Sequence, residues 1–222
     1  MEVRNMMNTT AELGRPTPPA SSATVTLHPM WVRITHWMTA ASVIVLVLSG
    51  WKIYNASPIF ASWTFPSQYT LGGWLGGALQ WHFAAMWVLL LSGLPYLVLN
   101  LTTGRLWRKF FPLSAKLLWT DIASALRGKL SHADPEKFNA AQKAAYLSVI
   151  LTLIIVVMSG LAIWKSVQFP LLRELMGGYD NARIVHFLAM GCIVAFFVVH
   201  MVMVALVPRS LLTMLHVRRR SR

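Results

Sequence analysis

Four stretches of this chain are long and apolar enough to cross a lipid bilayer, and they constrain its fold more than any other feature. They contain no Asp or Glu and run over Met30–Tyr54, Leu79–Leu101, Gln142–Trp164 and Arg183–Val207. A helix of roughly 20 apolar residues spans the hydrocarbon core. Because backbone groups in lipid must bond internally, we predict an all-α membrane protein built as a bundle of four transmembrane helices.

The basic residues predict how these helices are oriented. Only 12% of the 222 residues are charged. Sixteen of the 20 Lys and Arg lie before the first stretch or in its first turn, between the second and third stretches or in the first turn of the third, or after the fourth. By the positive-inside rule, these segments and both termini are cytoplasmic. We therefore expect a multi-pass protein of the bacterial inner (cytoplasmic) membrane, in contact with lipid. A net charge of +13 distributed in this way is a topology signal, and we expect no nucleic-acid partner.

The segments outside the spans complete the expected organisation. Residues 1–27 are rich in Pro, Ser, Thr and Ala and lack an apolar run of signal-peptide length, so we expect a disordered cytoplasmic tail. Residues 28–210 form the membrane domain, and residues 211–222 a basic cytoplasmic tail. The cytoplasmic loop carries apolar residues at helical spacing, which predict an amphipathic helix on the inner membrane surface: Leu113, Leu117, Leu118, Ile122 and Leu126.

Four histidines lie inside the apolar stretches. His186 and His200 are 14 residues apart, which returns them to one face of a helix about 21 Å apart along its axis. His36 and His82 lie near the starts of the first and second stretches. With the orientation above, His36 shares the cytoplasmic level with His200, and His82 shares the outer level with His186.

Paired imidazoles at two levels predict two haem groups. Imidazole is a favoured axial ligand of haem iron, so the pairs His36/His200 and His82/His186 would each hold one b haem. Cys192 is the only cysteine, which excludes a Cys-x-x-Cys-His attachment and makes both haems noncovalent. Taken singly, a histidine near the end of a span is more often a polar residue at the membrane interface than a ligand, but four that form two level pairs favour ligation.

Further patterns near the histidines have two interpretations each. Arg33 and Arg183 each precede a histidine by three residues, where a guanidinium pairs with a haem propionate or with a lipid headgroup. Small residues that allow close approach of helices or of a flat macrocycle occur at Ser49-Gly50, Ser92-Gly93 and Ser159-Gly160. The aromatic residues of the outer connection indicate an interfacial belt or a docking platform: Tyr54, Trp63, Phe65, Tyr69 and Trp74.

These residues resemble the bacterial cytochrome b561 and Ni,Fe-hydrogenase b-type cytochrome superfamily. The similarity lies in the sequence from Arg33 to Trp37, in His82 and in the spacing of His186 and His200. The sequences from Ile53 to Phe83 and from Asn139 to Lys143 look like the branch found beside periplasmic molybdopterin oxidoreductases, such as thiosulfate reductase or formate dehydrogenase.

The resemblance implies an electron-transfer subunit of an oxidoreductase complex, without catalytic residues of its own. Two haems on His36, His82, His186 and His200 would carry electrons between a periplasmic molybdopterin oxidoreductase and the quinone pool. It also implies a quinone site near His200, where Asn139, Gln142 and Lys143 open the third stretch. Their side chains can donate hydrogen bonds to a quinone carbonyl and equally suit a helix start.

Two alternatives remain open from the sequence. One is a stand-alone oxidoreductase that passes electrons from superoxide or another small donor to quinone. The other is a haem-free membrane anchor or a transporter that uses the histidines as a proton relay.

Overall fold

The computed structural model describes residues 30–111, 114–126, 140–206, 211 and 214–215. The expected tail over residues 1–27, most of the tail over residues 211–222, and Asn139 lie outside these residues. Every regular element within the described ranges is a helix. The predicted all-α fold class is confirmed.

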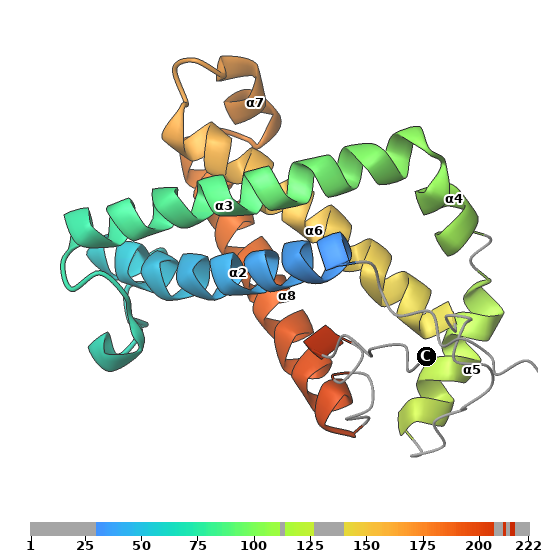
Figure 1. Cartoon of the computed structure of the whole chain (residues 1–222). Helices are drawn as coiled ribbons and strands as arrows, with labels where there is room; N and C mark the ends of the chain where they lie inside the picture. The colour runs from blue at the N-terminus through green and yellow to red at the C-terminus, as the bar shows by residue number, and fades with distance from the viewer. Residues whose placement is uncertain (1–29, 112–113, 127–139, 207–210, 212–213, 216–222) are drawn as a thin grey trace, which may run out of the picture.

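Four long helices form the body of the molecule (Figure 1). They are α2 (Met30–Ala56), α3 (Leu75–Thr102), α6 (Ala140–Trp164) and α8 (Tyr179–Leu206), and each is long and apolar enough to cross a membrane. The four predicted stretches are confirmed, with ends that differ by at most a few residues from those expected.

The long helices are arranged as two hairpins. Helix α2 packs along α3, and α6 packs along α8. The hairpins meet where Tyr54 of α2 stacks on Phe187 of α8, with ring centroids 4.8 Å apart. Offset stacking of this kind adds to the apolar burial that holds helices together.

Short helices mark the two ends of the hairpins. The turns hold η1 (Ser67–Tyr69), between α2 and α3, and α7 (Pro170–Leu175), between α6 and α8. We call this the η1/α7 end. At the opposite end, α3 is followed by α4 (Arg105–Phe110) and α5 (Ala115–Leu126), and we call it the α4/α5 end.

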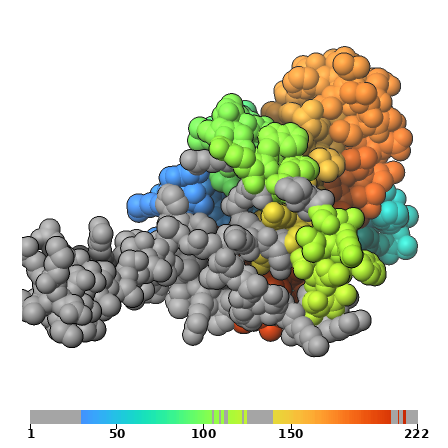
Figure 2. All heavy atoms as spheres, turned by 90° about the vertical axis from the view of Figure 1, so that its right-hand side faces the viewer, coloured from blue at the N-terminus to red at the C-terminus, as the bar shows by residue number. Residues whose placement is uncertain are grey.

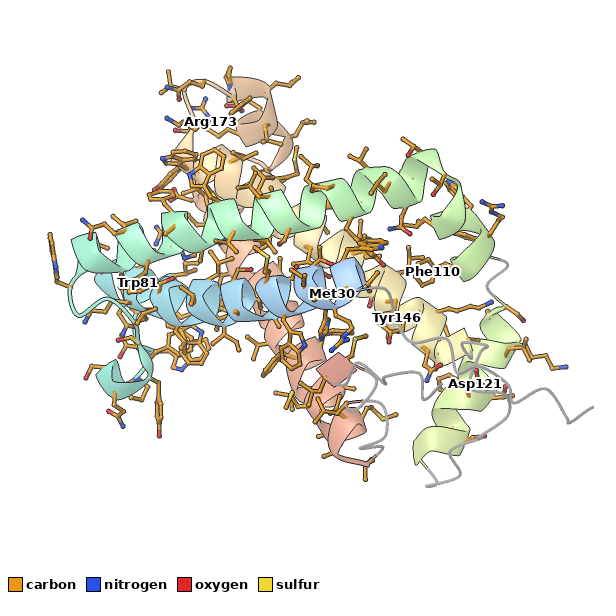
Figure 3. All side chains as sticks on the ribbon, viewed as in Figure 1. Met30, Trp81, Phe110, Asp121, Tyr146 and Arg173 are labelled. Carbon is orange, nitrogen blue, oxygen red and sulfur yellow. The ribbon has the colours of Figure 1, made fainter. Side chains whose placement is uncertain are left out.

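Helix α5 is the helix predicted in the middle loop, although Leu113 lies outside the described residues. Figure 2 shows it lying against α6. The carboxylate of Asp121 accepts a hydrogen bond of 2.8 Å from the backbone N–H of Ala140, at the first residue of α6 (Figure 3). The first N–H groups of a helix have no partner within the helix, so Asp121 acts as a cap supplied by a neighbouring helix.

The connection between α2 and α3 is folded around its aromatic residues. Trp63 and Phe65 pack with ring centroids 5.0 Å apart, and Trp63 also contacts Phe187 at 5.7 Å. The side chain of Asn55 both donates to the Phe65 carbonyl (2.8 Å) and accepts from the Phe65 N–H (2.9 Å). Part of the expected belt is therefore a packed cluster, whereas Trp74 is 70% exposed.

The two hairpins are two copies of one pattern. Helices α3 and α8 have the same length, 28 residues, and each carries His-Phe-x-Ala-Met at the same distance from its start, at His82 and His186. Helices α2 and α6 each carry Ser-Gly-x-x-Ile at the same distance from their start, at Ser49 and Ser159. Both serines are fully buried. This repeat was not predicted from the sequence.

The copies differ at the α4/α5 end. In the register set by the shared motifs, Tyr146 of α6 takes the position that His36 has in α2. Tyr96 of α3 likewise takes the position that His200 has in α8. The repeat thus conserves one histidine level and changes the other.

Candidate functional site

The structure brings the four intramembrane histidines together as two facing pairs. His82 of α3 faces His186 of α8 near the η1/α7 end, with ring centroids 6.4 Å apart. His36 of α2 faces His200 of α8 toward the α4/α5 end, at 6.2 Å. These are the pairs expected from membrane depth, and α8 contributes one ring to each.

The separation within each pair fits two imidazoles on opposite sides of one metal ion. A metal–imidazole bond is about 2 Å long and the ring radius adds about 1 Å on each side, so such rings have centroids about 6 Å apart. Within the described residues, no group of three or more His, Cys, Asp or Glu side chains is placed to hold a metal. Two axial nitrogens per site fit an iron whose other four ligands come from a porphyrin.

The hydrogen bonds of His186 determine which nitrogen points away from α6. Its Nδ1 lies 3.0 Å from the carbonyl oxygen of Val156 and 3.1 Å from Oγ of Ser159. A carbonyl only accepts hydrogen bonds, so Nδ1 carries the proton and Nε2 keeps a free electron pair. This is the tautomer that an axial ligand bound through Nε2 requires.

His82 is held in the same way by the first hairpin. Its Nδ1 lies 3.0 Å from Oγ of Ser49, and the Leu46 backbone also bonds to the ring. Leu46 and Val156 precede Ser49 and Ser159 by the same three residues. The two ligands near the η1/α7 end therefore have duplicated supports.

The glycines that follow these serines give the imidazoles room. A Cβ built on Gly50 lies 3.5 Å from Cε1 of His82, and one built on Gly160 lies 3.2 Å from Cε1 of His186. A Cβ on Gly93, in the third Ser-Gly pair, meets nothing within 4 Å. Two of the three predicted close approaches are thus made to histidines.

Aromatic rings accompany the pair toward the α4/α5 end. His200 stacks on Phe196, with centroids 5.9 Å apart and planes inclined by 11°. His36 meets the edge of Trp37 at 5.5 Å. These rings shape an apolar environment around the second pair.

Both predicted arginines bind backbone carbonyls. Arg33 donates to the carbonyl oxygens of Met214 (2.8 Å) and Leu215 (2.7 Å). Arg183 donates to the carbonyl oxygen of Ser57 at the end of α2, and its Nη2 lies 3.2 Å from the Ser57 hydroxyl. Partners so distant in sequence gave no signal in the sequence analysis.

The residues expected at a quinone site lie at the start of α6. Gln142 and Lys143 are in its first turn, beside the cap formed by Asp121. One turn further, Tyr146 lies next to Phe110 of α4, with ring centroids 6.5 Å apart (Figure 3). Asn139 lies outside the described residues.

Comparison with known proteins agrees with this geometry. The family model for prokaryotic cytochrome b561 matches residues 27–216. The putative protein-methionine-sulfoxide reductase subunit YedZ1 of Azospira oryzae is 59% identical over 189 residues, which cover 85% of this chain and 95% of that protein. No solved structure matches. This chain therefore belongs to the prokaryotic cytochrome b561 family, and it is a haem-binding membrane protein of that type.

Proposed function

We propose that this chain is a di-haem b-type cytochrome that carries electrons across the bacterial inner membrane between the quinone pool and a periplasmic redox enzyme. The observation that carries the proposal is the two pairs of facing imidazoles, with centroids 6.2 and 6.4 Å apart, at different levels of one bundle. Each pair suits one noncovalent haem.

The residues of this chain bind, orient and space the two haems, and the haem iron supplies the one-electron chemistry. His82 and His186 hold one group near the η1/α7 end, and His36 and His200 hold the other. Because α8 contributes to both sites, a single rigid helix sets their separation, at about 21 Å between its two ligand positions.

The relative and the distribution of charge support one direction of flow. The Azospira protein is described as a subunit of a protein-methionine-sulfoxide reductase. Reduction of a sulfoxide to a thioether consumes two electrons and two protons and releases water. The η1/α7 end carries few basic residues and faces the periplasm. Electrons therefore enter from quinol at the α4/α5 end and leave to a reductase, of the molybdopterin type in the related branch.

Arg33 and Arg183 have a second role in this proposal. Arg33 uses Nε and Nη2 on the carbonyls of Met214 and Leu215, and a guanidinium has five N–H donors. The remaining donors of each arginine serve a propionate of the nearer haem. Quinol binds beside the first turn of α6, at Asn139, Gln142 and Lys143.

Paired substitutions test the haem assignment. The full chain would be purified from haem-replete cells as wild type, as His36→Ala/His200→Ala and as His82→Ala/His186→Ala. We expect two haems per chain in the wild type and one in each double variant, by haem extraction and by reduced-minus-oxidised spectra. A mixed variant, His36→Ala/His82→Ala, removes one ligand from each site and should lose both.

Haem that persists undiminished in either double variant would overturn the assignment. Co-purification with a periplasmic reductase subunit, and quinol-dependent reduction of methionine sulfoxide by the complex, support the proposed partner. Oxidation of superoxide by the chain alone, with quinone as acceptor and without any partner, would instead establish the stand-alone alternative. Absence of haem from the wild type would favour an anchor or transporter.

A further inference from the structure

We propose that Ser49 and Ser159 are positioning residues for the haem between His82 and His186, and that they lower its reduction potential by accepting hydrogen bonds from the two ligands. The inference rests on the proposed function, because it requires an iron between these rings. It assigns a role to two side chains that touch neither iron nor substrate.

The direction of each hydrogen bond follows from the bonds that the serines make within their own helices. The hydroxyl of Ser49 lies 2.6 Å from the carbonyl oxygen of Val45, and that of Ser159 lies 2.7 Å from the carbonyl oxygen of Ile155. A carbonyl cannot donate, so each hydroxyl proton points into its helix. The oxygen lone pairs are then available to the histidine, whose Nδ1–H donates to them.

The repeat provides independent support for this arrangement. The distances from serine Oγ to histidine Nδ1 are 3.0 Å in the first hairpin and 3.1 Å in the second. Each hairpin also supplies a backbone partner from the residue three positions before the serine. Because this hydrogen-bond arrangement occurs in both hairpins, the two histidines that would hold one iron are supported alike.

A third serine shows that the pattern is not a general consequence of packing. Ser92 also bonds to a carbonyl one turn back, that of Val88 at 2.8 Å, and it is buried. Its hydroxyl lies 3.3 Å from Thr39 rather than from a histidine. Ser92 is therefore a matched control: a buried serine that precedes a glycine and makes the same helical bond.

The hydrogen bond from each histidine to its serine changes how strongly the histidine binds iron. An acceptor on Nδ1–H fixes the ring orientation and makes Nε2 a stronger donor to the metal. A stronger donor stabilises ferric more than ferrous iron, so the potential falls. Loss of the serine leaves only the backbone partner on Nδ1–H. It should therefore raise the potential of this haem and weaken its retention, by roughly the 10- to 100-fold in metal affinity that follows loss of a hydrogen-bond partner of a metal ligand.

The test places serine substitutions in proteins that keep a single haem. Ser49→Ala and Ser159→Ala would be made, singly and together, in the His36→Ala/His200→Ala variant, which keeps only the haem near the η1/α7 end. The same substitutions in the His82→Ala/His186→Ala variant provide the reciprocal background. Spectroscopic redox titration and the rate of haem transfer to apomyoglobin are the two measurements.

We expect an upward shift of the potential and faster haem loss only in the first background, with the double substitution having the larger effect. Ser159→Cys keeps a side chain of nearly the same size but offers a weak acceptor, and it should behave like Ser159→Ala. Ser92→Ala should leave the potential in the first background unchanged.

Three outcomes would overturn the inference. They are an unchanged potential in the serine variants, an equal shift in both backgrounds, and a wild-type potential in Ser159→Cys, which would show that only the volume of the side chain matters. Failure of the proposed function would be seen separately. In that case the two histidine double variants, with all serines intact, would not each retain one haem.

Discussion

The imidazole rings of His82 and His186 face each other with their centroids 6.4 Å apart, although they belong to different hairpins. Whatever binds between them joins the two halves of the molecule. Haem binding and association of the hairpins are therefore coupled, since a ligand that binds only the folded form stabilises it.

Haem removal should lower the stability of the chain. Protein produced in haem-deficient cells should unfold at a lower temperature than haem-replete protein. Addition of haem should raise its unfolding midpoint to that of the haem-replete protein. A ligand at 100 times its dissociation constant contributes about 2.7 kcal/mol. Thermal unfolding in one detergent, followed by circular dichroism, measures the effect. Equal midpoints with and without haem would contradict the coupling.

Gly160→Ala should disturb haem binding more than Gly50→Ala. The added methyl group lies 3.2 Å from the His186 ring in the first case and 3.5 Å from the His82 ring in the second. The shorter distance requires the imidazole to move, whereas the longer one is an ordinary contact. Haem content and the potential of the haem near the η1/α7 end would be compared. Gly93→Ala has nothing to displace and should match the wild type.

Asp121→Ala should destabilise the start of α6. The carboxylate of Asp121 accepts from the backbone N–H of Ala140 at 2.8 Å, and loss of a helix cap costs about 1 kcal/mol. We expect faster amide hydrogen exchange in the first turn of α6, with both haems retained. Asp180→Ala is the control, because its side chain is 90% exposed. Similar exchange of α6 in the two variants would disprove a capping role.

Asn55→Ala should loosen the connection between α2 and α3. The substitution removes two hydrogen bonds to the Phe65 backbone and leaves a backbone donor and acceptor without them. Limited proteolysis should then cleave residues 57–74 faster. Asn100→Ala, which removes a bond to the Tyr96 carbonyl within one helix, should leave cleavage there unchanged.

The sequence predicted the features that depend on local composition. Apolar stretches of span length gave all four long helices, and the depth of each histidine gave pairs that the structure brings face to face. Helices α4 and α7 were not predicted, because each has only six residues, too few for a periodic pattern.

The supporting contacts could not be read from a single segment. A serine inside a membrane helix always has a carbonyl of its own helix within reach. Whether it also meets a histidine depends on how two helices are rotated against each other. A comparison of the two hairpins would have helped, since Ser-Gly-x-x-Ile and His-Phe-x-Ala-Met recur at Ser49, Ser159, His82 and His186.

The imperfect repeat makes the proposed electron route asymmetric. Near the η1/α7 end, both halves of the molecule contribute an imidazole from equivalent positions. At the other end only α2 and α8 do so, because α6 and α3 carry Tyr146 and Tyr96 instead. A protein with two identical halves would hold two histidine pairs at the α4/α5 end, whereas this chain keeps one. In the proposed route, electrons would therefore reach that end of the bundle at a single site.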